Sequence, residues 1–459
     1  MANVNIVLAN SINNTNATGL VLNDADNALT VSSAGFIFGG GAGNEGVDFA
    51  NAVATNRITV AGIVSSSNFD AVRFASTGSV TVTASGVISA VAAGSYGLFF
   101  EGTGVNSVKN FGLIEGTLAA ITSVNASDTI FNAGTIIGNL GLGNGADTLV
   151  NVGTINGGIV TNGSLSFQNT GLVTGAVTSA ALADIYDGSA GGVVIGRINL
   201  AGGDDTFTGS SRTDRIEGGS GVDTGDLGGG GDTFFATGGA DGSDEIDGGD
   251  GIDTYDASAI TAATNINLDN NLAFGPDIQT DLILNFENIT GGTGNDVLIG
   301  NAGTNVLFGN NGNDQIFGNQ GNDILRGGLG ADSIYGGQGQ DQMFGGLNDN
   351  SADTFIFFTT TETSTTARDV IHHFEGAGIV GGDVISLSAI DARTNVAGDQ
   401  AFTFLGAGAF TGVSGQLRIE ANPGGGTTAV VGDVNGDRVA DFRISLVGNL
   451  TFIGGDFVL

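Results

Sequence analysis

The sequence predicts an all-β protein in three parts: an N-terminal parallel β-helix, a parallel β-roll and a C-terminal β-sandwich-like cap. Two observations predict this fold class. A glycine-rich unit of nine residues recurs in the second half of the chain, and short β-branched segments broken by Gly and Asn recur in the first half. The 83 glycines would suggest disorder if they were aperiodic, but 41% of the residues are hydrophobic and 28 are Phe, which favours a folded, turn-rich protein.

The nine-residue unit runs from Gly291 to Phe344 without insertion or deletion. Glycine occupies position one, often position two, and position four, so the first six residues can form a tight turn that side chains would forbid. Position six is Asp296, Asn305, Asp314, Asp323, Asp332 and Asp341. Position eight is Leu298, Leu307, Ile316, Leu325, Ile334 and Met343. A flexible linker has no reason to keep an apolar residue at every ninth place, so we interpret the segment as a folded roll.

The last three residues of each unit are expected to form a short strand whose position-eight side chain points inward. Two units make one coil of eighteen residues, so position six should form two ladders: Asp296, Asp314 and Asp332 in one, and Asn305, Asp323 and Asp341 in the other. Carboxylates stacked at strand spacing repel each other without a cation. Calcium prefers carboxylate and carbonyl oxygens and tolerates flexible geometry, so it suits this turn.

These nonapeptides closely resemble the calcium-binding repeats of the RTX (haemolysin-type) proteins. The resemblance implies several bound Ca²⁺ ions. We expect the ligand-bearing turns to contain Asp253, Gly292, Gly294, Asp296, Gly312, Asp314, Gly321, Asp323, Gly330, Asp332, Gly339 and Asp341. Imperfect units upstream make Asp204, Asp223 and Asp253 secondary calcium candidates, with solvated turns as the alternative interpretation.

Residues 1–180 carry a second, looser repeat that predicts the β-helix. The motif Asn-x-Gly followed by β-branched residues begins at Asn110, Asn132, Asn151 and Asn169, at spacings of 22, 19 and 18 residues. We expect these strands to form successive coils and the asparagines to stack along one corner. An antiparallel sandwich of hairpins is the alternative, but hairpin strands need not resemble each other.

We place the remaining domain boundaries where the composition and the repeat pattern of the sequence change. Residues 181–290 form an acidic transitional region with imperfect repeats, 291–350 the β-roll, and 351–459 the cap. From about 245 onward the succession of motifs resembles the C-terminal domain of serralysin metalloproteases, which implies a calcium-loaded roll closed by a cap. The final residues, Asp456-Phe457-Val458-Leu459, resemble an uncleaved type I secretion signal. The secretion machinery is therefore an expected partner, and the expected location is extracellular or at the cell surface.

Two further motifs in the cap leave alternatives open. Asp433, Asn435, Asp437 and Asp441 have the spacing that begins an EF-hand loop, but Arg438 stands where a turn glycine is expected, and an acidic hairpin turn is the alternative. His372 and His373 are adjacent and would face opposite sides of a strand, so we expect them to have a structural or surface role.

Composition narrows the function. With 12 basic against 47 acidic residues and a net charge of −35, nucleic acid and anionic membrane surfaces are unsuitable partners. There is no cysteine, no standard signal peptide at the N-terminus and no apolar run long enough to span a membrane. Two histidines cannot supply the three zinc ligands of a serralysin protease, so the resemblance covers that family's C-terminal domain and not its protease domain.

We therefore predict a secreted, non-catalytic calcium-binding protein that folds outside the cell, with a surface-layer, matrix or adhesive role and with itself or cell-surface polysaccharide as a further partner. The rival hypothesis is a lyase, epimerase or hydrolase that acts on polysaccharide at the N-terminal β-helix. Its scattered candidate residues are Asp70, Arg73, Tyr96, Glu101, Lys109 and Glu115. No motif connects them, and a solvated exterior position is the expected role for each.

Overall fold

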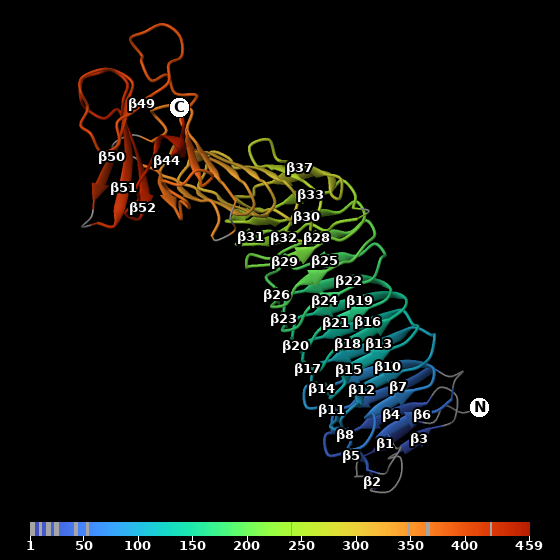
Figure 1. The fold of residues 1–459 in the computed structure, drawn as a ribbon. Helices are drawn as coiled ribbons and strands as arrows, with labels where there is room; N and C mark the ends of the chain where they lie inside the picture. Colours follow the sequence, from blue (N-terminus) through green and yellow to red (C-terminus); the bar gives the residue numbers. More distant parts are fainter. Residues whose placement is uncertain are drawn as a thin grey trace. The chain divides into compact units, whose positions relative to one another are not determined.

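The computed structural model describes residues 5–8, 12–14, 20–22, 27–40, 45–51, 55–239, 241–347, 349, 351–363, 368–422 and 425–459. The chain divides into two units: unit 1 comprises 1–234 with 249–251, and unit 2 comprises 235–248 with 252–459. Figure 1 follows the strands along the chain within each unit. No helix in the described ranges is long and apolar enough to cross a membrane.

Unit 1 is a parallel β-helix with three strands in each coil. Sheet A contains β1 (Asn5–Leu8), β4 (Ala28–Val31), β7 (Thr55–Val60), β10 (Thr77–Val82), β13 (Asn106–Asn110), β16 (Asp128–Asn132), β19 (Ala146–Asn151), β22 (Ser164–Asn169), β25 (Ile185–Asp187), β28 (Thr206–Thr208) and β30 (Thr224–Asp226). Sheet B contains β2 (Ile12–Asn14), β5 (Phe36–Gly39), β8 (Ile63–Ser66), β11 (Val87–Ala90), β14 (Leu113–Gly116), β17 (Thr135–Ile137), β20 (Thr154–Asn156), β23 (Leu172–Val173) and β26 (Val193–Val194).

Sheet C completes each coil of unit 1. It contains β3 (Leu20–Leu22), β6 (Val47–Phe49), β9 (Val72–Phe74), β12 (Tyr96–Phe100), β15 (Ala119–Ser123), β18 (Leu140–Gly143), β21 (Ile159–Thr161), β24 (Val177–Thr178), β27 (Ile198–Asn199), β29 (Arg215–Glu217) and β32 (Thr233–Phe235). A short pair, β31 (Gly229–Gly230) and β34 (Asp250–Gly251), lies outside these sheets. Successive coils pair in parallel and in register, which confirms the predicted β-helix and rejects the hairpin alternative.

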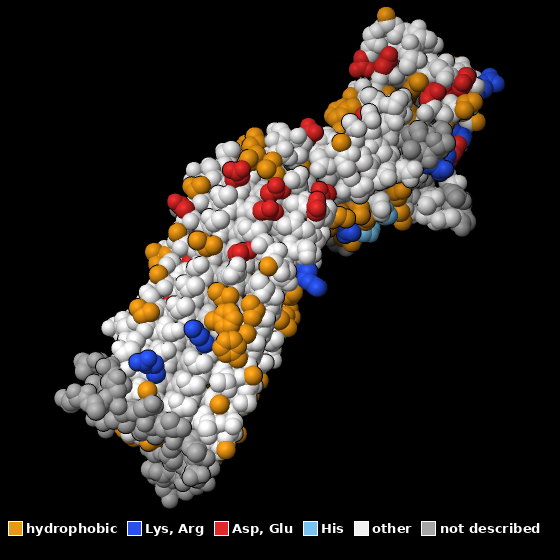
Figure 2. All heavy atoms as spheres, turned by 180° about the vertical axis from the view of Figure 1, so that it is seen from behind, with side chains coloured by type: hydrophobic (Ala, Val, Ile, Leu, Met, Phe, Trp, Pro, Cys, Tyr) orange, Lys and Arg blue, Asp and Glu red, His pale blue; other side chains and the backbone are white. Residues whose placement is uncertain are grey.

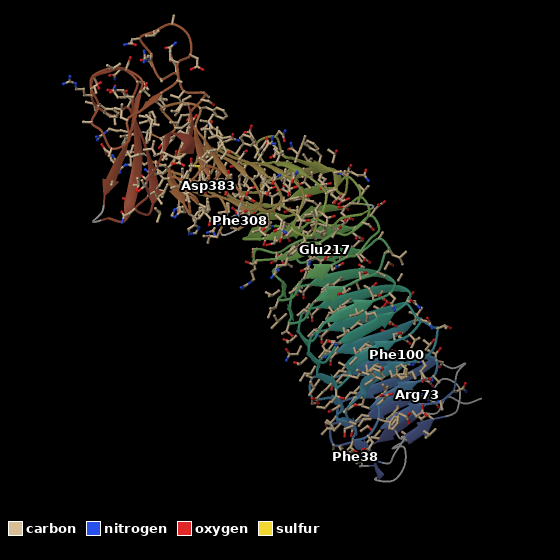
Figure 3. All side chains as sticks on the ribbon, viewed as in Figure 1. Phe38, Arg73, Phe100, Glu217, Phe308 and Asp383 are labelled. Carbon is tan, nitrogen blue, oxygen red and sulfur yellow. The ribbon has the colours of Figure 1, made fainter. Side chains whose placement is uncertain are left out.

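Identical inward positions stack from coil to coil and form the core of unit 1. Phe49, Phe74 and Phe100 lie at paired register positions, with ring centroids 4.6 and 5.0 Å apart; Figure 3 marks Phe100. The predicted asparagine corner is also present, because each buried amide donates to the next: Asn110 Nδ2 to Asn132 Oδ1 (2.8 Å), Asn132 to Asn151 (2.8 Å), and Asn151 to Asn169 (2.9 Å). At Gly153 a Cβ would overlap the carbonyl of Gly134 in the previous coil, which explains the recurring Asn-x-Gly.

The acidic stretch after residue 180 differs from the expectation of an irregular transitional region. Sheet B ends at β26, while sheets A and C continue through β28, β29, β30 and β32, so the coil simply loses one strand and becomes two-sided. The division into units lies between Phe234 and Phe235, and the boundaries near residues 180, 290 and 350 stay predictions. Irregular composition hid this regularity because short coils need only an apolar residue at position eight and a turn.

Unit 2 is a two-sided roll followed by the cap. Its A strands are β33 (Glu245–Asp247), β36 (Asn265–Asn267), β37 (Leu272–Gly275), β38 (Gln279–Leu284), β40 (Val297–Ile299), β42 (Gln315–Gly321), β44 (Ser333–Gly339), β46 (Thr354–Ile356), β48 (Val384–Ser386) and β53 (Phe457–Val458). Its C strands are β35 (Thr254–Asp256), β39 (Asn288–Thr290), β41 (Val306–Asn311), β43 (Ile324–Leu329), β45 (Gln342–Phe344), β47 (Val370–His372), β49 (Thr403–Phe404), β50 (Gln416–Asn422), β51 (Thr427–Asp433) and β52 (Phe442–Val447).

The six predicted position-eight residues, from Leu298 to Met343, are all fully buried, which confirms the core of the roll. β36, β37 and β38 form an antiparallel excursion whose outer strands rejoin the parallel sheet. In the cap, β50, β51 and β52 form an antiparallel meander that joins the roll through β47. The last strand, β53, pairs with β48, and Phe457 packs against Phe404 and Phe452. Asp456, at the end of the single-turn helix η1 (Gly454–Asp456), accepts the N–H of Gly378.

Candidate calcium-binding ladder

The position-six aspartates of unit 2 form two continuous ladders inside the roll. On the A side, Asp314 Oδ1 accepts the N–H of Asp296 and Asp332 Oδ1 accepts that of Asp314, both at 2.8 Å. On the C side, Asp323 accepts from Asn305 at 2.8 Å and Asp341 accepts from Asp323 at 2.9 Å. Every one of these side chains is buried. The two ladders have the membership that the eighteen-residue coil predicts.

The turns that precede these aspartates require glycine. Position four has a left-handed backbone, with φ of 129° at Gly312, 132° at Gly321, 125° at Gly330 and 151° at Gly339. Position two is also left-handed, even where it is Asn: φ is 73° at Asn310. The Asn310 side chain donates to the carbonyl of Gly291 in the previous coil at 2.7 Å. The turns are therefore shaped by backbone geometry that few side chains tolerate.

Each interior carboxylate keeps one oxygen without a hydrogen-bond partner among the described residues. These atoms are the Oδ2 atoms of Asp314, Asp323, Asp332 and Asp341. Burial raises the pKa of Asp314 and Asp323 to about 7, of Asp332 to about 8 and of Asp341 to about 6. A buried polar atom with no partner is costly, and the cost is larger for an ionised group. The ladder is therefore incomplete as protein alone at neutral pH.

Two of the orphaned oxygens, those of Asp314 and Asp323, lie close to a glycine and to a main-chain carbonyl oxygen. An ideal Cβ on Gly309 would overlap Asp314 Oδ2 and the carbonyl of Gly327, and a Cβ on Gly318 would overlap Asp323 Oδ2 and the carbonyl of Gly336. A carboxylate and a main-chain carbonyl oxygen, both of the type that calcium prefers, thus lie close to the same glycine. The described ranges hold no group of three or more His, Cys, Asp or Glu around a common point. An ion here would therefore take most of its ligands from main-chain carbonyls.

The first coil of the roll differs from the interior ones. The second oxygen of Asp296 accepts the N–H of Gly292 at 2.7 Å, and neither Gly292 nor Gly294 has the left-handed backbone of the later position-four glycines. At the next rung, the Asn305 amide accepts from Asn301 N–H at 2.9 Å and donates to Glu287 O at 2.7 Å. The chain itself satisfies both side chains at this end.

Unit 1 contains a similar ladder of buried aspartates. It includes Asp205 and not its neighbour Asp204, which the sequence pattern suggested. Asp205, not Asp204, is buried, and its Oδ1 accepts the N–H of Asp184 at 2.7 Å. Asp223 continues the ladder by accepting from Asp205 at 2.9 Å. Asp204 is exposed and its carboxylate accepts from Val222 N–H. The choice of Asp204 is therefore corrected to Asp205: position six directly precedes the Thr-Phe-Thr strand β28, and two consecutive aspartates made the register ambiguous.

Further position-six aspartates were not singled out from the sequence. On the C side of unit 1, Asp232 accepts from Asp214 at 2.7 Å. In unit 2 the ladders extend into the cap through Asp353, Asp383 and Asp369, which accept at 3.0, 2.9 and 3.0 Å. These residues could have been found in the sequence as an Asp two residues before an apolar residue of a strand, even where the preceding turn lacks the glycines of the repeat. Asp253 is also fully buried, and its N–H donates to Glu287 Oε2 at 2.8 Å.

Comparison with protein families identifies the repeat. Residues 201–234, 286–316 and 317–352 match the family model "RTX calcium-binding nonapeptide repeat (4 copies)". The chain carries RTX repeats. These segments contain Asp205, Asp214, Asp223 and Asp232 of unit 1 and the four interior aspartates of the unit 2 roll. The match ends at residue 352, so the serralysin-like cap stays a prediction.

Solved structures with some similarity include two subunits of the Azotobacter vinelandii mannuronan C5-epimerase. AlgE6R3 is 24% identical over 36% of this chain and 78% of its own, with a TM-score of 0.14. AlgE6R2 is 21% identical over 37% and 91%, with a TM-score of 0.16. The extracellular lipase LipA of Serratia marcescens is 18% identical over 56% and 40%, with a TM-score of 0.17. A search of the curated proteins found no match. At these TM-scores the likenesses carry no functional argument.

The EF-hand-like loop between β51 and β52 is closed by its own hydrogen bonds. Asp433 accepts from Gly436 N–H at 2.6 Å and from Arg438 N–H at 3.0 Å, and Asp441 accepts from Val434 N–H at 2.7 Å. Arg438 has a φ of 73°, the left-handed conformation for which glycine is expected. These contacts are those of a tight acidic hairpin turn, and metal binding there stays an untested alternative.

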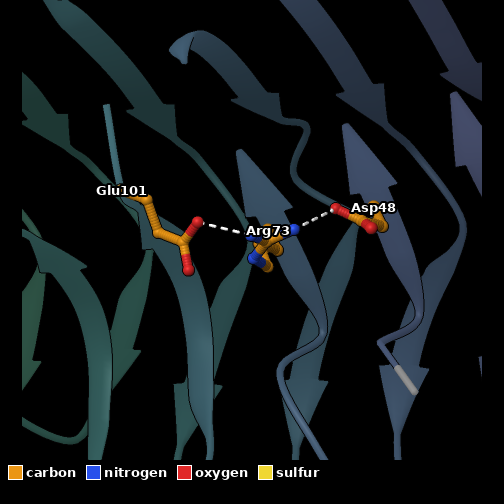
Figure 4. A network of polar contacts seen from close by, with 3 residues as sticks. All are labelled: Asp48, Arg73 and Glu101. Atoms are coloured by element: carbon orange, nitrogen blue, oxygen red, sulfur yellow. Dashed lines mark hydrogen bonds and ion pairs between the residues drawn. The ribbon is translucent and has the colours of Figure 1, made fainter. Parts of the chain in front are cut away.

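Four of the six catalytic candidates lie in neighbouring coils on sheet C of unit 1. Arg73 in β9 forms ion pairs with Asp48 at 2.9 Å and with Glu101 (Figure 4). Asp70 Oδ1 accepts the N–H of Tyr96 at 2.9 Å, and burial raises the pKa of Asp70. Lys109 in β13 and Glu115 in β14 lie on the other two faces. The guanidinium is thus neutralised from both sides, an arrangement that holds adjacent coils together.

Proposed function

We propose that the protein is a secreted, non-catalytic calcium-binding protein whose roll folds as calcium binds. The observation that carries this proposal is the row of buried, unpartnered Oδ2 atoms at Asp314, Asp323, Asp332 and Asp341. At Asp314 and Asp323 a main-chain carbonyl oxygen lies close to the same glycine as Oδ2. Where calcium is scarce, as in the cytosol, the ladder carboxylates oppose folding. Outside the cell, at millimolar calcium, binding free energy becomes folding free energy. The type I secretion machinery is the proposed export partner.

The N-terminal β-helix is proposed to do the biological work as surface-layer, matrix or adhesive material. In Figure 2 most of the visible face is backbone and side chains that are neither charged nor hydrophobic, with scattered charged side chains and patches of hydrophobic ones. Repeating strands with in-register outward rows provide a long regular surface, which suits assembly or attachment.

The test is a calcium titration of metal-stripped protein, followed by circular dichroism and by light scattering coupled to size exclusion. Replacing Asp314, Asp323 and Asp332 together by Ala should raise the calcium needed for folding several-fold. The matched control replaces three exposed aspartates, Asp226, Asp269 and Asp399, which removes the same charge. Equal calcium dependence in the two variants would reject the ladder as the calcium site. Growth of assemblies with calcium supports a matrix role, whereas a compact monomer favours a soluble module.

The second candidate is an enzyme acting on polysaccharide at sheet C of unit 1. Its supporting observation is the group of carboxylates around Arg73, where burial raises the pKa of both Glu45 and Asp70. Raised carboxyl pKa values suit general acids. Incubation of the calcium-loaded protein with acidic and neutral polysaccharides, read by chain length and by unsaturated or epimerised products, tests this candidate. Activity that disappears in Asp70→Asn would favour it over the non-catalytic proposal.

A further inference from the structure

An aromatic and cationic ladder runs along the outside of the unit 2 roll at position nine of the C strands. Phe308, Arg326, Phe344 and His372 occupy paired register positions in four successive coils; Figure 3 marks Phe308 at its start. The Arg326 guanidinium carbon lies 5.4 Å from the Phe308 ring centroid and 4.5 Å from that of Phe344. The Phe344 and His372 rings stack at 4.3 Å with an interplanar angle of 10°.

The Arg326 guanidinium packs against the aromatic rings of Phe308 and Phe344 and not against carboxylates. It is exposed and makes no ion pair with any described residue, although the chain has 47 acidic and only 12 basic residues. A guanidinium stacked between two rings loses little further freedom when it binds, and its edge keeps several N–H donors in a planar fork. That fork matches a carboxylate in two-point geometry. The ladder therefore presents a preorganised anion-binding group on an otherwise acidic protein.

A hollow of about 360 Å³ lies beside this ladder, where the strands pass into the turns. Its lining residues include Asn310, Asn311 and His373, together with Leu329 and Leu347, whose side chains are exposed. Both histidines of the chain thus lie at this one place, and Figure 2 shows them in pale blue beside basic and hydrophobic side chains. The hollow combines a cation, an amide that bonds hydroxyls, and apolar surface.

We propose that this hollow binds a carboxylate-bearing saccharide. Arg326 takes the sugar carboxylate, the Asn311 amide bonds ring hydroxyls, and Leu329 and Leu347 cover an apolar ring face. Overall charge does not prevent this, because exposed charges farther than about 8 Å are screened at physiological salt, and in the calcium-loaded protein the bound ions offset the charge of the buried aspartates. The inference deepens the adhesive role proposed above and gives it a ligand class.

The experiment is isothermal titration of the calcium-loaded full chain with tetragalacturonate, its methyl ester and acetate. Tetragalacturonate should bind, while the ester, which lacks the charge, and acetate, which lacks the ring, should bind at least about tenfold more weakly. Arg326→Gln should weaken tetragalacturonate binding by about tenfold or more. The matched control is Arg57→Gln, because Arg57 in β7 is an exposed arginine of unit 1 that should leave binding unchanged.

Calcium held between the oligosaccharide and exposed aspartates could also give binding, but that binding would not depend on Arg326. Equal affinity of wild type and Arg326→Gln, or equal affinity for the acid and its ester, would overturn the proposal. Calcium-dependent folding of each variant, followed by circular dichroism, is a separate readout. Normal folding without saccharide binding therefore rejects this inference and leaves the calcium proposal standing.

Discussion

Asp314 accepts the main-chain N–H of Asp296, eighteen residues earlier, through Oδ1 at 2.8 Å. The same carboxylate leaves Oδ2 buried without a partner. Oδ1 therefore links two coils through a hydrogen bond, while Oδ2 has no hydrogen-bond partner among the described residues and is available to a cation. This division of work between the two oxygens explains why Asp occupies the position: Asn in its place, as at Asn305, satisfies itself with amide hydrogen bonds and needs no cation.

Stability of the metal-free roll should fall as pH rises. Burial raises the folded-state pKa of Asp314 and Asp323 to about 7 and of Asp332 to about 8, against about 3.9 in an unfolded chain. The folded state then binds more protons between about pH 4 and 8, so its stability is greatest at the acidic end of this window and is lost as pH rises through the folded pKa values. Chelator-treated protein should gain roll structure at pH 5 relative to pH 8, as measured by circular dichroism and urea unfolding.

Calcium should reverse that slope, because the ion needs the ionised carboxylate. The difference in unfolding midpoint with and without saturating calcium should therefore grow from pH 5 to pH 8. A metal-free stability that is flat or rises over this range would contradict the buried-ladder interpretation.

Asp205 and Asp204 offer a matched pair of adjacent carboxylates. Asp205→Ala removes the acceptor of the Asp184 N–H and should reduce calcium-dependent protection of the surrounding coils several-fold. Asp204→Ala removes an exposed side chain and should change little. Hydrogen exchange of the 184–234 segment across a calcium titration separates the two. A larger loss of calcium-dependent protection in Asp204→Ala than in Asp205→Ala would assign Asp204 to the ladder instead.

Asn151 should be essential to the β-helix. In Asn151→Ala, the buried Asn132 amide loses its acceptor and Asn169 loses its donor, each at a cost of about 1–3 kcal/mol. Asn144→Ala also removes a coil-to-coil amide bond, to Asn125, but in an exposed place, and should cost less than about 0.5 kcal/mol. Denaturant unfolding in calcium measures both variants. Similar losses would mean that the buried ladder contributes no more than a surface contact.

Gly327→Ala tests the cation cradle without altering any carboxylate. The backbone at Gly327 is not left-handed, but a Cβ there would overlap Asp332 Oδ2. We expect at least one fewer calcium ion per chain by equilibrium dialysis and a higher calcium midpoint. Gly141→Ala is the control, since its nearest neighbour would be Thr122 Oγ1 at 3.7 Å. If Gly327→Ala binds as many calcium ions per chain as the wild type, calcium does not bind beside Gly327.

The sequence predicted those parts of the fold in which the same type of residue recurs at the same position of every coil. The inward apolar residues from Leu298 to Met343 and the stacked asparagines follow directly from periodicity, because an identical side chain must meet an identical environment in every coil. Asp205 was misassigned because Asp204 precedes it and local composition cannot choose between neighbours. The register is decided instead by which carboxylate reaches the N–H of the previous coil.

Other features depended on contacts that periodicity does not encode. Asp353, Asp369 and Asp383 lie after insertions that break the nine-residue count, yet their strands still pair with the roll. The grouping of Arg73 with Asp48 and Glu101, or of Arg326 with Phe344 and His372, needs the coil lengths that bring distant residues into register. Coil lengths vary in unit 1 and before His372, so the neighbours there could not be derived from the sequence, whereas the pairing of Arg326 with Phe344 lies within the unbroken eighteen-residue spacing.

The ladder in unit 2 also has a polarity. Each acceptor carboxylate comes from the coil that follows its donor: Asp314 serves Asp296, Asp332 serves Asp314, Asp353 serves Asp332 and Asp383 serves Asp353. The carboxylate acceptors thus always lie in the C-terminal neighbour, while the N–H groups of Asn313, Ala331 and Gln340 donate in the opposite sense, to asparagine side chains of the preceding coil. The last acceptor of this row, Asp383, lies in the cap, so the cap supplies the carboxylate that completes the turn at Asp353 and closes the C-terminal end of the roll.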